Sequence, residues 1–152
     1  EEAMCHKCFD MGEFIIQKYH GVPLNFWDFE VIDVLEDEIG EEIPLIKLED
    51  LENSTNSVYD IPFGYTVENR KITNLMLVDK GIELVNLAIG TLAKLEYLNL
   101  YKNNVRDIPG SFQELAYLKR LDLRQNHIRI NTVELKMTIE VLRQNGCEIL
   151  ID

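Results

Sequence analysis

The chain has 152 residues, of which 46% are apolar and 28% are charged, and this composition is ordinary for a soluble globular protein. The net charge is −12 and is unevenly distributed: residues 1–70 carry 17 acidic and 4 basic side chains, whereas residues 71–152 carry 10 acidic and 11 basic ones. This acidic surplus argues against nucleic acid and anionic membranes as partners, because both bind basic surfaces. The sequence has no apolar run of about 18 residues, so we expect no membrane-spanning segment.

Cysteine usage indicates a reducing compartment. The three cysteines, Cys5, Cys8 and Cys147, are sparse and odd in number, and we expect them to be reduced thiols. The first residues show no basic stretch followed by an apolar one, which a secretory signal peptide requires. We therefore expect a cytoplasmic protein. Because the chain starts at Glu1 without a methionine, the alternative that a segment or domain precedes it in a longer protein stays open.

The first of two predicted helices covers residues 2–19. Met4, Cys8, Met11 and Ile15 follow one another at steps of 4, 3 and 4, so they share one face of a helix. This apolar face is expected to pack against the next helix.

A second helix is predicted between Asn25 and Gly40. Asn25 is a suitable N-cap, Asp28 lies near the positive end of the helix, and Gly40 is a suitable C-terminal stop. Its expected apolar side consists of Phe29, Ile32, Leu35 (or Val31) and Ile39. The aromatic residues near its start are interpreted as an anchor on the first repeat, with an exposed binding knob as the alternative; they are Phe26, Trp27 and Phe29.

The segment between the helices and the repeats contains shorter elements. Ile43–Leu48 is expected to be a short strand or an extended stretch, and the polar residues Asn53–Ser57 are expected to form a linking loop. Tyr65–Val67 reads as a strand and Glu68–Lys71 as a tight turn. We expect this strand to pair with the one that begins at Ile72 and so to cover an open sheet edge.

Three segments of the second half align without a gap at a step of 23 residues: ITNLMLVDKGI (Ile72–Ile82), LEYLNLYKNNV (Leu95–Val105) and LKRLDLRQNHI (Leu118–Ile128). A fixed period with the pattern L-x-x-L-x-L-x-x-N-x-L is typical of a repeat protein. On these residues the chain resembles the leucine-rich-repeat family over roughly residues 65–152, whereas the first 60 residues resemble no family that we can name. The resemblance implies an α/β fold, namely a short solenoid with parallel strands on its concave face, and a function in protein binding.

The repeat pattern predicts the core. Alternate side chains of a strand point the same way, so each L-x-L pair is expected to contribute to two stacked apolar ladders, formed by Leu75, Leu77, Leu98, Leu100, Leu121 and Leu123. Asn103 and Asn126 occupy the asparagine position, where a buried amide can pair with backbone groups, whereas the first repeat has Lys80 there. The return segments between the strands are expected to be short helices or irregular turns.

The last 21 residues predict a helix and a strand. Thr132 is the expected N-cap of a helix over Thr132–Asn145, and Gly146 is its expected stop. Cys147–Asp152 alternates like a last strand, whose isoleucines would continue the two ladders. The predicted architecture is therefore an acidic, mainly helical N-terminal cap over residues 1–60 and a leucine-rich-repeat domain over residues 61–152 with a C-terminal helix–strand cap.

The residues between the core leucines are expected to face outward on the concave sheet, where solenoids bind extended partners. The candidate partner-binding residues are Asn74, Met76, Val78, Tyr97, Asn99, Tyr101, Arg120, Asp122 and Arg124. The two tyrosines and two arginines among the last six form a compact patch of types that are enriched at binding hot spots. Two alternatives stay open: an ordinary surface on which arginines stack on tyrosines, and an acidic cap that folds toward the arginines.

Other constellations predict no chemistry. The single C-x-x-C of Cys5 and Cys8 lacks the roughly four ligands of a zinc site. The acidic run over residues 36–42 is interpreted as a solvated helix end rather than a catalytic pair, and the histidines as surface residues. The sequence has no glycine-rich phosphate loop and no nucleophile motif. We therefore expect no metal site, no cofactor and no enzymatic activity.

The leading hypothesis is a monomeric, cytoplasmic protein-interaction or scaffold module that binds another protein through the concave face. The alternative is a regulatory or substrate-recognition domain of a larger enzyme or signalling protein, because repeat domains are often fused to GTPase, kinase or ubiquitin-ligase modules. An innate recognition receptor is disfavoured, since neither a signal peptide nor cysteine-rich caps are visible in the sequence.

Overall fold

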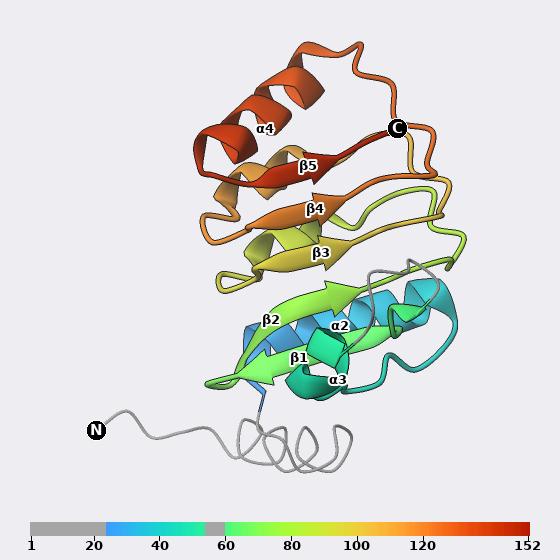
Figure 1. The fold of residues 1–152 in the computed structure, drawn as a ribbon, viewed down its shortest axis with the longest axis vertical. Helices are drawn as coiled ribbons and strands as arrows, with labels where there is room; N and C mark the ends of the chain where they lie inside the picture. The colour runs from blue at the N-terminus through green and yellow to red at the C-terminus, as the bar shows by residue number, and fades with distance from the viewer. Residues whose placement is uncertain (1–23, 54–59) are drawn as a thin grey trace.

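The computed structural model describes residues 24–53 and 60–152 and gives a mixed α/β fold around one five-stranded sheet (Figure 1). The strands lie side by side in chain order, and only the first pair is antiparallel. Their bounds are β1 Gly64–Glu68, β2 Lys71–Met76, β3 Tyr97–Asn99, β4 Arg120–Asp122 and β5 Glu148–Leu150. The expected pairing of the strand around Tyr65 with the first repeat strand is confirmed.

The β1–β2 hairpin closes through a two-residue turn. Asn69 and Arg70 have φ angles of 49° and 65°, and positive φ at both positions is the mark of a type I′ turn. The register shifts between Thr66 and Val67, where β1 carries an irregularity. The hairpin supplies an antiparallel neighbour on the side of β2 that faces away from the parallel strands.

Helix α2 (Phe26–Ile39) forms where the capping residues predicted it. The Asn25 side chain accepts a hydrogen bond from the Trp27 amide at 3.1 Å, and Gly40 ends the helix with a φ of 79°. The predicted apolar side is confirmed, because Phe29, Val31, Ile32 and Leu35 are buried and Ile39 packs against the core. Trp27 and Phe26 are exposed, so of the aromatic cluster only Phe29 anchors the helix.

Two polar contacts attach α2 to the hairpin. The Ile72 amide donates to the Asp28 carboxylate at 2.8 Å, and the Asn25 amide donates to the Arg70 carbonyl at 2.8 Å. Asp28 is buried, and burial raises the pKa of its carboxyl above 3.8, although the Ile72 hydrogen bond and the Lys71 charge oppose the shift.

The segment after α2 follows one of the two predicted alternatives. Ile43–Leu48 makes a single parallel bridge, between Leu45 and Tyr65, and is an extended stretch rather than a strand. A short helix, α3 (Leu48–Asn53), follows it and was not predicted. Six residues are too few to display a helical period, and all of them are exposed or only half-buried.

The return segments are helical, as expected. They are the 3₁₀ helices η2 (Leu87–Thr91) and η3 (Gly110–Glu114) and the α-helix α4 (Val133–Gln144). The Thr132 hydroxyl accepts from the Leu135 amide at 3.1 Å at the start of α4, and Gly146 follows its end with a φ of 88°. The predicted C-terminal helix and strand are thus confirmed.

The two leucine ladders form the core. The six ladder leucines are at most 1% exposed, and they pack with the apolar side of α2 in one continuous cluster. Ile149 and Ile151 join this cluster but are only partly buried, because β5 is the last strand of the sheet.

The asparagine position joins each repeat to the one before it. Asn103 donates to the Leu77 and Leu100 carbonyls at 2.8 and 2.9 Å and accepts from the Lys80 and Ile82 amides at 2.9 and 3.0 Å. An asparagine at position 80 would have no earlier repeat to bond. The Lys80 ammonium instead reaches Glu41, in the segment after α2, at 2.5 Å.

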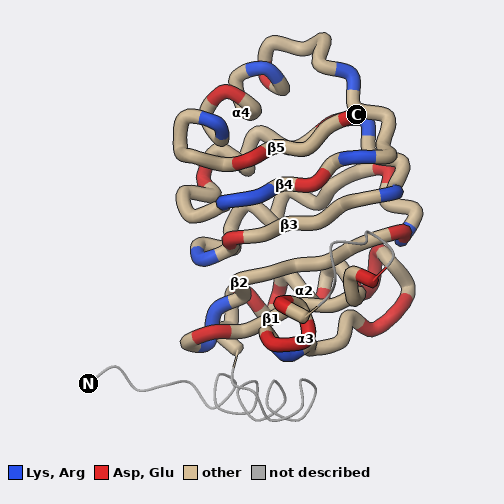
Figure 2. The backbone as a smooth tube through the Cα atoms, viewed as in Figure 1, with Lys and Arg blue, Asp and Glu red and all other residues tan. Residues whose placement is uncertain are grey.

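Charge divides the molecule as the sequence indicates. Acidic residues crowd α2, α3 and their connection, whereas the strands and turns of the repeats carry both signs (Figure 2). None of the helices in the described ranges is long and apolar enough to cross a membrane. The predicted helix over residues 2–19, the Cys5–Cys8 motif and all but the first residue of the predicted loop at 53–57 lie outside the described residues.

Candidate functional site

The strands place six of the nine predicted binding residues in two regular columns on the sheet face that turns away from the leucine ladders, here called the outer sheet face. Residue pairing aligns Asn74, Tyr97, Arg120 and Glu148 in one column. The next column contains Met76, Asn99, Asp122 and Leu150. Both columns have the registers that the repeat alignment predicts.

The three predicted residues of the second column are not accessible, which corrects the expectation that all nine residues face solvent. Met76, Asn99 and Asp122 are completely buried, although they lie outside the leucine core. The Asn99 side chain donates to the Tyr97 hydroxyl at 3.1 Å and accepts from the Tyr101 amide at 2.8 Å. Tyr97 and Tyr101 thus use the polar groups of Asn99, and among the residues of this column only Leu150 is partly exposed.

The four residues Tyr97, Tyr101, Arg120 and Arg124, here called the Tyr–Arg patch, pack in cross-repeat pairs. The Arg120 guanidinium carbon lies 5.5 Å from the centre of the Tyr97 ring, and that of Arg124 lies 5.8 Å from the Tyr101 ring. Both distances are within the range of a cation–π contact. Tyr101 is 8% exposed, so the surface offered to solvent consists mainly of Tyr97 and the two arginines.

Arg124 is held rigidly by a buried carboxylate. Its Nε and Nη2 atoms donate to the two oxygens of Asp122 at 3.0 and 2.6 Å, and its backbone amide donates to the same group at 3.1 Å. The hydrogen bond to Asp122 raises the pKa of the Arg124 guanidinium above its usual range. Arg124 therefore presents a guanidinium group that is fixed in position and whose charge is neutralised by the buried Asp122 carboxylate.

Arg120 is the more available cation. Its side chain is 45% exposed, and its Nε lies 3.3 Å from the carboxylate of Glu148, whose side chain is 63% exposed. An exposed pair of this kind contributes little stability and can exchange its partner. The carboxylates beside both arginines come from the repeat strands, Asp122 and Glu148, and not from α2.

Tyr97 is half-buried and oriented by its neighbours. Burial raises the pKa of its hydroxyl above 10, so the group stays protonated at neutral pH and can donate a hydrogen bond. Of the other predicted residues, Asn74 is buried and donates to the Thr66 hydroxyl at 2.8 Å. Val78, which follows the end of β2, is half-buried. The outer sheet face therefore offers one aromatic edge, one guanidinium group held by Asp122 and one more exposed guanidinium group, that of Arg120.

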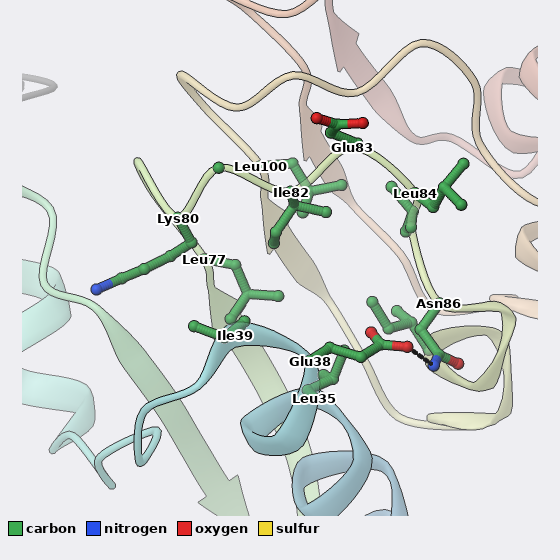
Figure 3. A pocket seen from close by; sticks show the side chains of 13 residues that line it. Leu35, Glu38, Ile39, Leu77, Lys80, Ile82, Glu83, Leu84, Asn86 and Leu100 are labelled. Atoms are coloured by element: carbon green, nitrogen blue, oxygen red, sulfur yellow. Dashed lines mark hydrogen bonds between the residues drawn. The ribbon is translucent and has the colours of Figure 1, made fainter.

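A groove between α2 and the first repeat was not predicted (Figure 3). It has a volume of about 360 Å³, and Glu38 and Glu83 stand at its rim. Its apolar lining consists of Leu35, Ile39, Leu77, Ile82, Leu84, Val85, Ile89 and Leu100. Leu84 lies outside the L-x-x-L-x-L pattern of the repeat, and an apolar residue outside that pattern was the available signal.

The described residues contain no group of three or more His, Cys, Asp or Glu side chains placed to hold a metal ion. The pair Cys5 and Cys8 lies outside them. His127 is exposed.

Residues 70–128 match the family model of the leucine rich repeat. This stretch of the chain carries leucine-rich repeats. The match covers all three aligned segments, and the resemblance is confirmed over residues 70–128. Leucine-rich-repeat domains generally mediate protein–protein interaction and are typically not enzymes. No curated protein matches the chain.

Proposed function

We propose that this leucine-rich-repeat protein is an interaction module that binds another protein through the outer sheet face, which is the concave face of its repeats. The Tyr–Arg patch lies at the centre of the proposed contact. The proposal is narrower than the sequence-based prediction, because the buried column of Met76, Asn99 and Asp122 supports the patch instead of touching the partner. We further propose that the protein acts as a monomer in the cytoplasm, without a cofactor.

One observation carries the proposal, namely that Tyr97, Arg120 and Arg124 are partly exposed and already ordered by their neighbours. Ordering a long side chain on binding costs about 0.5–1.5 kcal/mol, and this cost is largely met before the partner arrives. Tyrosine and arginine are also the residue types that dominate interface energetics. The half-exposed Arg120 with its exchangeable Glu148 pair suits a partner that brings its own carboxylate.

The test is affinity capture from lysate of the native source, comparing the wild type with the Tyr97→Ala/Arg120→Glu variant. A matched control is Tyr117→Ala/Lys94→Glu, because Lys94 lies 4.1 Å from the ring of Tyr117 in a turn, at the same 23-residue step but away from the outer sheet face. The proposal predicts a partner that the wild type and the control retain and the patch variant loses. Equal capture by all three proteins would refute it.

A further inference from the structure

The groove between α2 and the first repeat is an apolar cleft with an acidic rim. Its volume of about 360 Å³ falls in the range of sites that accept ligands or buried side chains. One wall comes from α2 through Leu35 and Ile39, and the other comes from the β2–η2 connection (Figure 3). These walls are apolar, so the cleft is suited to an apolar side chain.

Two strongly exposed leucines belong to the β2–η2 connection and the start of η2. Leu84 lines the groove and is 86% exposed, and Leu87, the first residue of η2, is 68% exposed. The exposure of these leucine side chains to water is unfavourable in free energy, and contact with the surface of another molecule would bury them and remove this cost. A small ligand confined to the groove would leave Leu87 in water, whereas a longer segment of another protein can cover both leucines.

The rim carries unmatched negative charge. Glu38 accepts a hydrogen bond from the neutral amide of Asn86 at 2.7 Å, and for Glu38 and Glu83 the described part of the chain provides no cationic partner (Figure 3). Lys80 also lines the groove, but its ammonium is engaged with Glu41 at 2.5 Å and lies 3.7 Å from the centre of the Phe63 ring. The charges left for a partner are therefore carboxylates.

We propose that this groove binds a segment of another protein that combines large apolar side chains with lysine or arginine, the apolar side chains entering between α2 and the first repeat while the cations meet Glu38 and Glu83. This site is separate from the Tyr–Arg patch and does not depend on the function proposed for it. Charge complementarity selects such a partner over a second copy of this chain, whose net charge is −12.

The test uses a synthetic amphipathic peptide of leucine and lysine, about 15 residues long, and a counterpart in which glutamate replaces lysine. Binding to the 152-residue chain is measured by isothermal titration calorimetry at two salt concentrations. The proposal predicts saturable one-to-one binding of the lysine peptide that weakens with salt, and no binding of the glutamate peptide.

Two variants locate the binding. Leu84→Ser should weaken it about tenfold or more, whereas Leu48→Ser, which alters an exposed leucine of α3, should leave it within about twofold. Glu38→Gln/Glu83→Gln should weaken it about threefold to tenfold and reduce its salt dependence. Glu49→Gln/Glu52→Gln on α3 makes the same change of net charge outside the groove and serves as the control.

Three results would overturn the proposal. Equal weakening by the rim and α3 charge variants would mean nonspecific attraction to an acidic protein. Self-association of the free chain that Leu84→Ser abolishes would assign the groove to a second copy. A lower unfolding midpoint of Leu84→Ser without peptide would mean that the chain itself covers this leucine. The Tyr97→Ala/Arg120→Glu variant should bind the peptide normally, so that failure at one site is distinguished from failure at the other.

Discussion

The most demanding structural prediction concerns Asn103, whose side chain links the first two repeats. Asn103→Ala removes an amide that makes four hydrogen bonds of 3.0 Å or less, two to carbonyls and two from amides, at a site that is nearly closed to water. The truncation adds no bulk and changes no charge. Its effect therefore reports on the loss of these bonds.

The magnitude follows from the groups left unpaired. A buried donor or acceptor without a partner costs about 1–3 kcal/mol, and water reaches some of these groups once the side chain is shortened. We expect Asn103→Ala to lower the free energy of unfolding by about 3–5 kcal/mol, a large part of the roughly 5–15 kcal/mol of a typical domain. Asn126→Ala should cost less, about 1–2 kcal/mol, because Asn126 is half-buried and water can replace its bonds.

The assay is urea denaturation followed by far-ultraviolet circular dichroism, with the slope of the transition compared among the variants. Asn104→Ala is the matched control, because it removes the same side chain from the exposed neighbouring position and should change stability by less than about 0.5 kcal/mol. A loss below about 1 kcal/mol for Asn103→Ala, or an equal loss for Asn126→Ala, would refute the reasoning from buried hydrogen bonds.

Three further predictions concern single side chains. Asp28→Ala should cost about 1–3 kcal/mol by leaving the buried Ile72 amide unpaired. Because the pKa of Asp28 is raised above 3.8 in the folded state, the folded chain binds a proton at this carboxyl more readily than the unfolded chain does. The free energy of unfolding of the wild type, relative to that of Asp28→Asn, should therefore rise as pH falls from neutral toward 4. Urea titrations in which this difference falls with pH would contradict the prediction. Burial, with the charge of Glu148, raises the pKa of the Cys147 thiol to about 11. In a variant whose other two cysteines are replaced by serine, Cys147 should react with a disulfide reagent at pH 8 at least about 100-fold more slowly in the folded than in the unfolded chain. Similar rates in the two states would disprove its burial. The only tryptophan, Trp27, is 69% exposed, so its emission should be that of a solvated indole and fully quenchable by acrylamide, and a blue-shifted, protected emission in the native chain would contradict its exposure.

The repeat alignment predicts much of the fold because the repeat encodes its own neighbours. A fixed step of 23 residues aligns equivalent side chains on adjacent strands, and the ladder from Leu75 through Leu98 to Leu121 follows from that step alone. Capping residues such as Asn25 and Thr132 act within one turn of their helices, so their roles are also local. Within the described residues, the helix ends predicted from these capping residues were confirmed, whereas the helix predicted over residues 2–19 lies outside them.

The accessibility of the candidate site could not be predicted in the same way. Strand alternation gives the direction of the Asn99 and Asp122 side chains, but their burial depends on how Tyr97 and Arg124 lean across them. The groove likewise depends on where α2 packs against the β2–η2 connection. This packing brings together residues such as Glu38 and Asn86, which are 48 positions apart in the chain and share no sequence pattern. The sequence shows Leu84 as an apolar residue outside the repeat pattern, but it does not show which residues of α2 lie beside it in the groove.

The measurement that tests the central claim most directly is the dissociation constant between this protein and the partner recovered by affinity capture, determined for purified wild type, Tyr97→Ala/Arg120→Glu and Tyr117→Ala/Lys94→Glu. Circular dichroism first establishes that all three are folded. Loss of a hot-spot pair costs at least about 2 kcal/mol, so the account predicts about 30-fold or greater weakening for the Tyr–Arg patch variant and less than about twofold for the control. Unchanged affinity of the patch variant, or equal weakening of both, would contradict binding through this face.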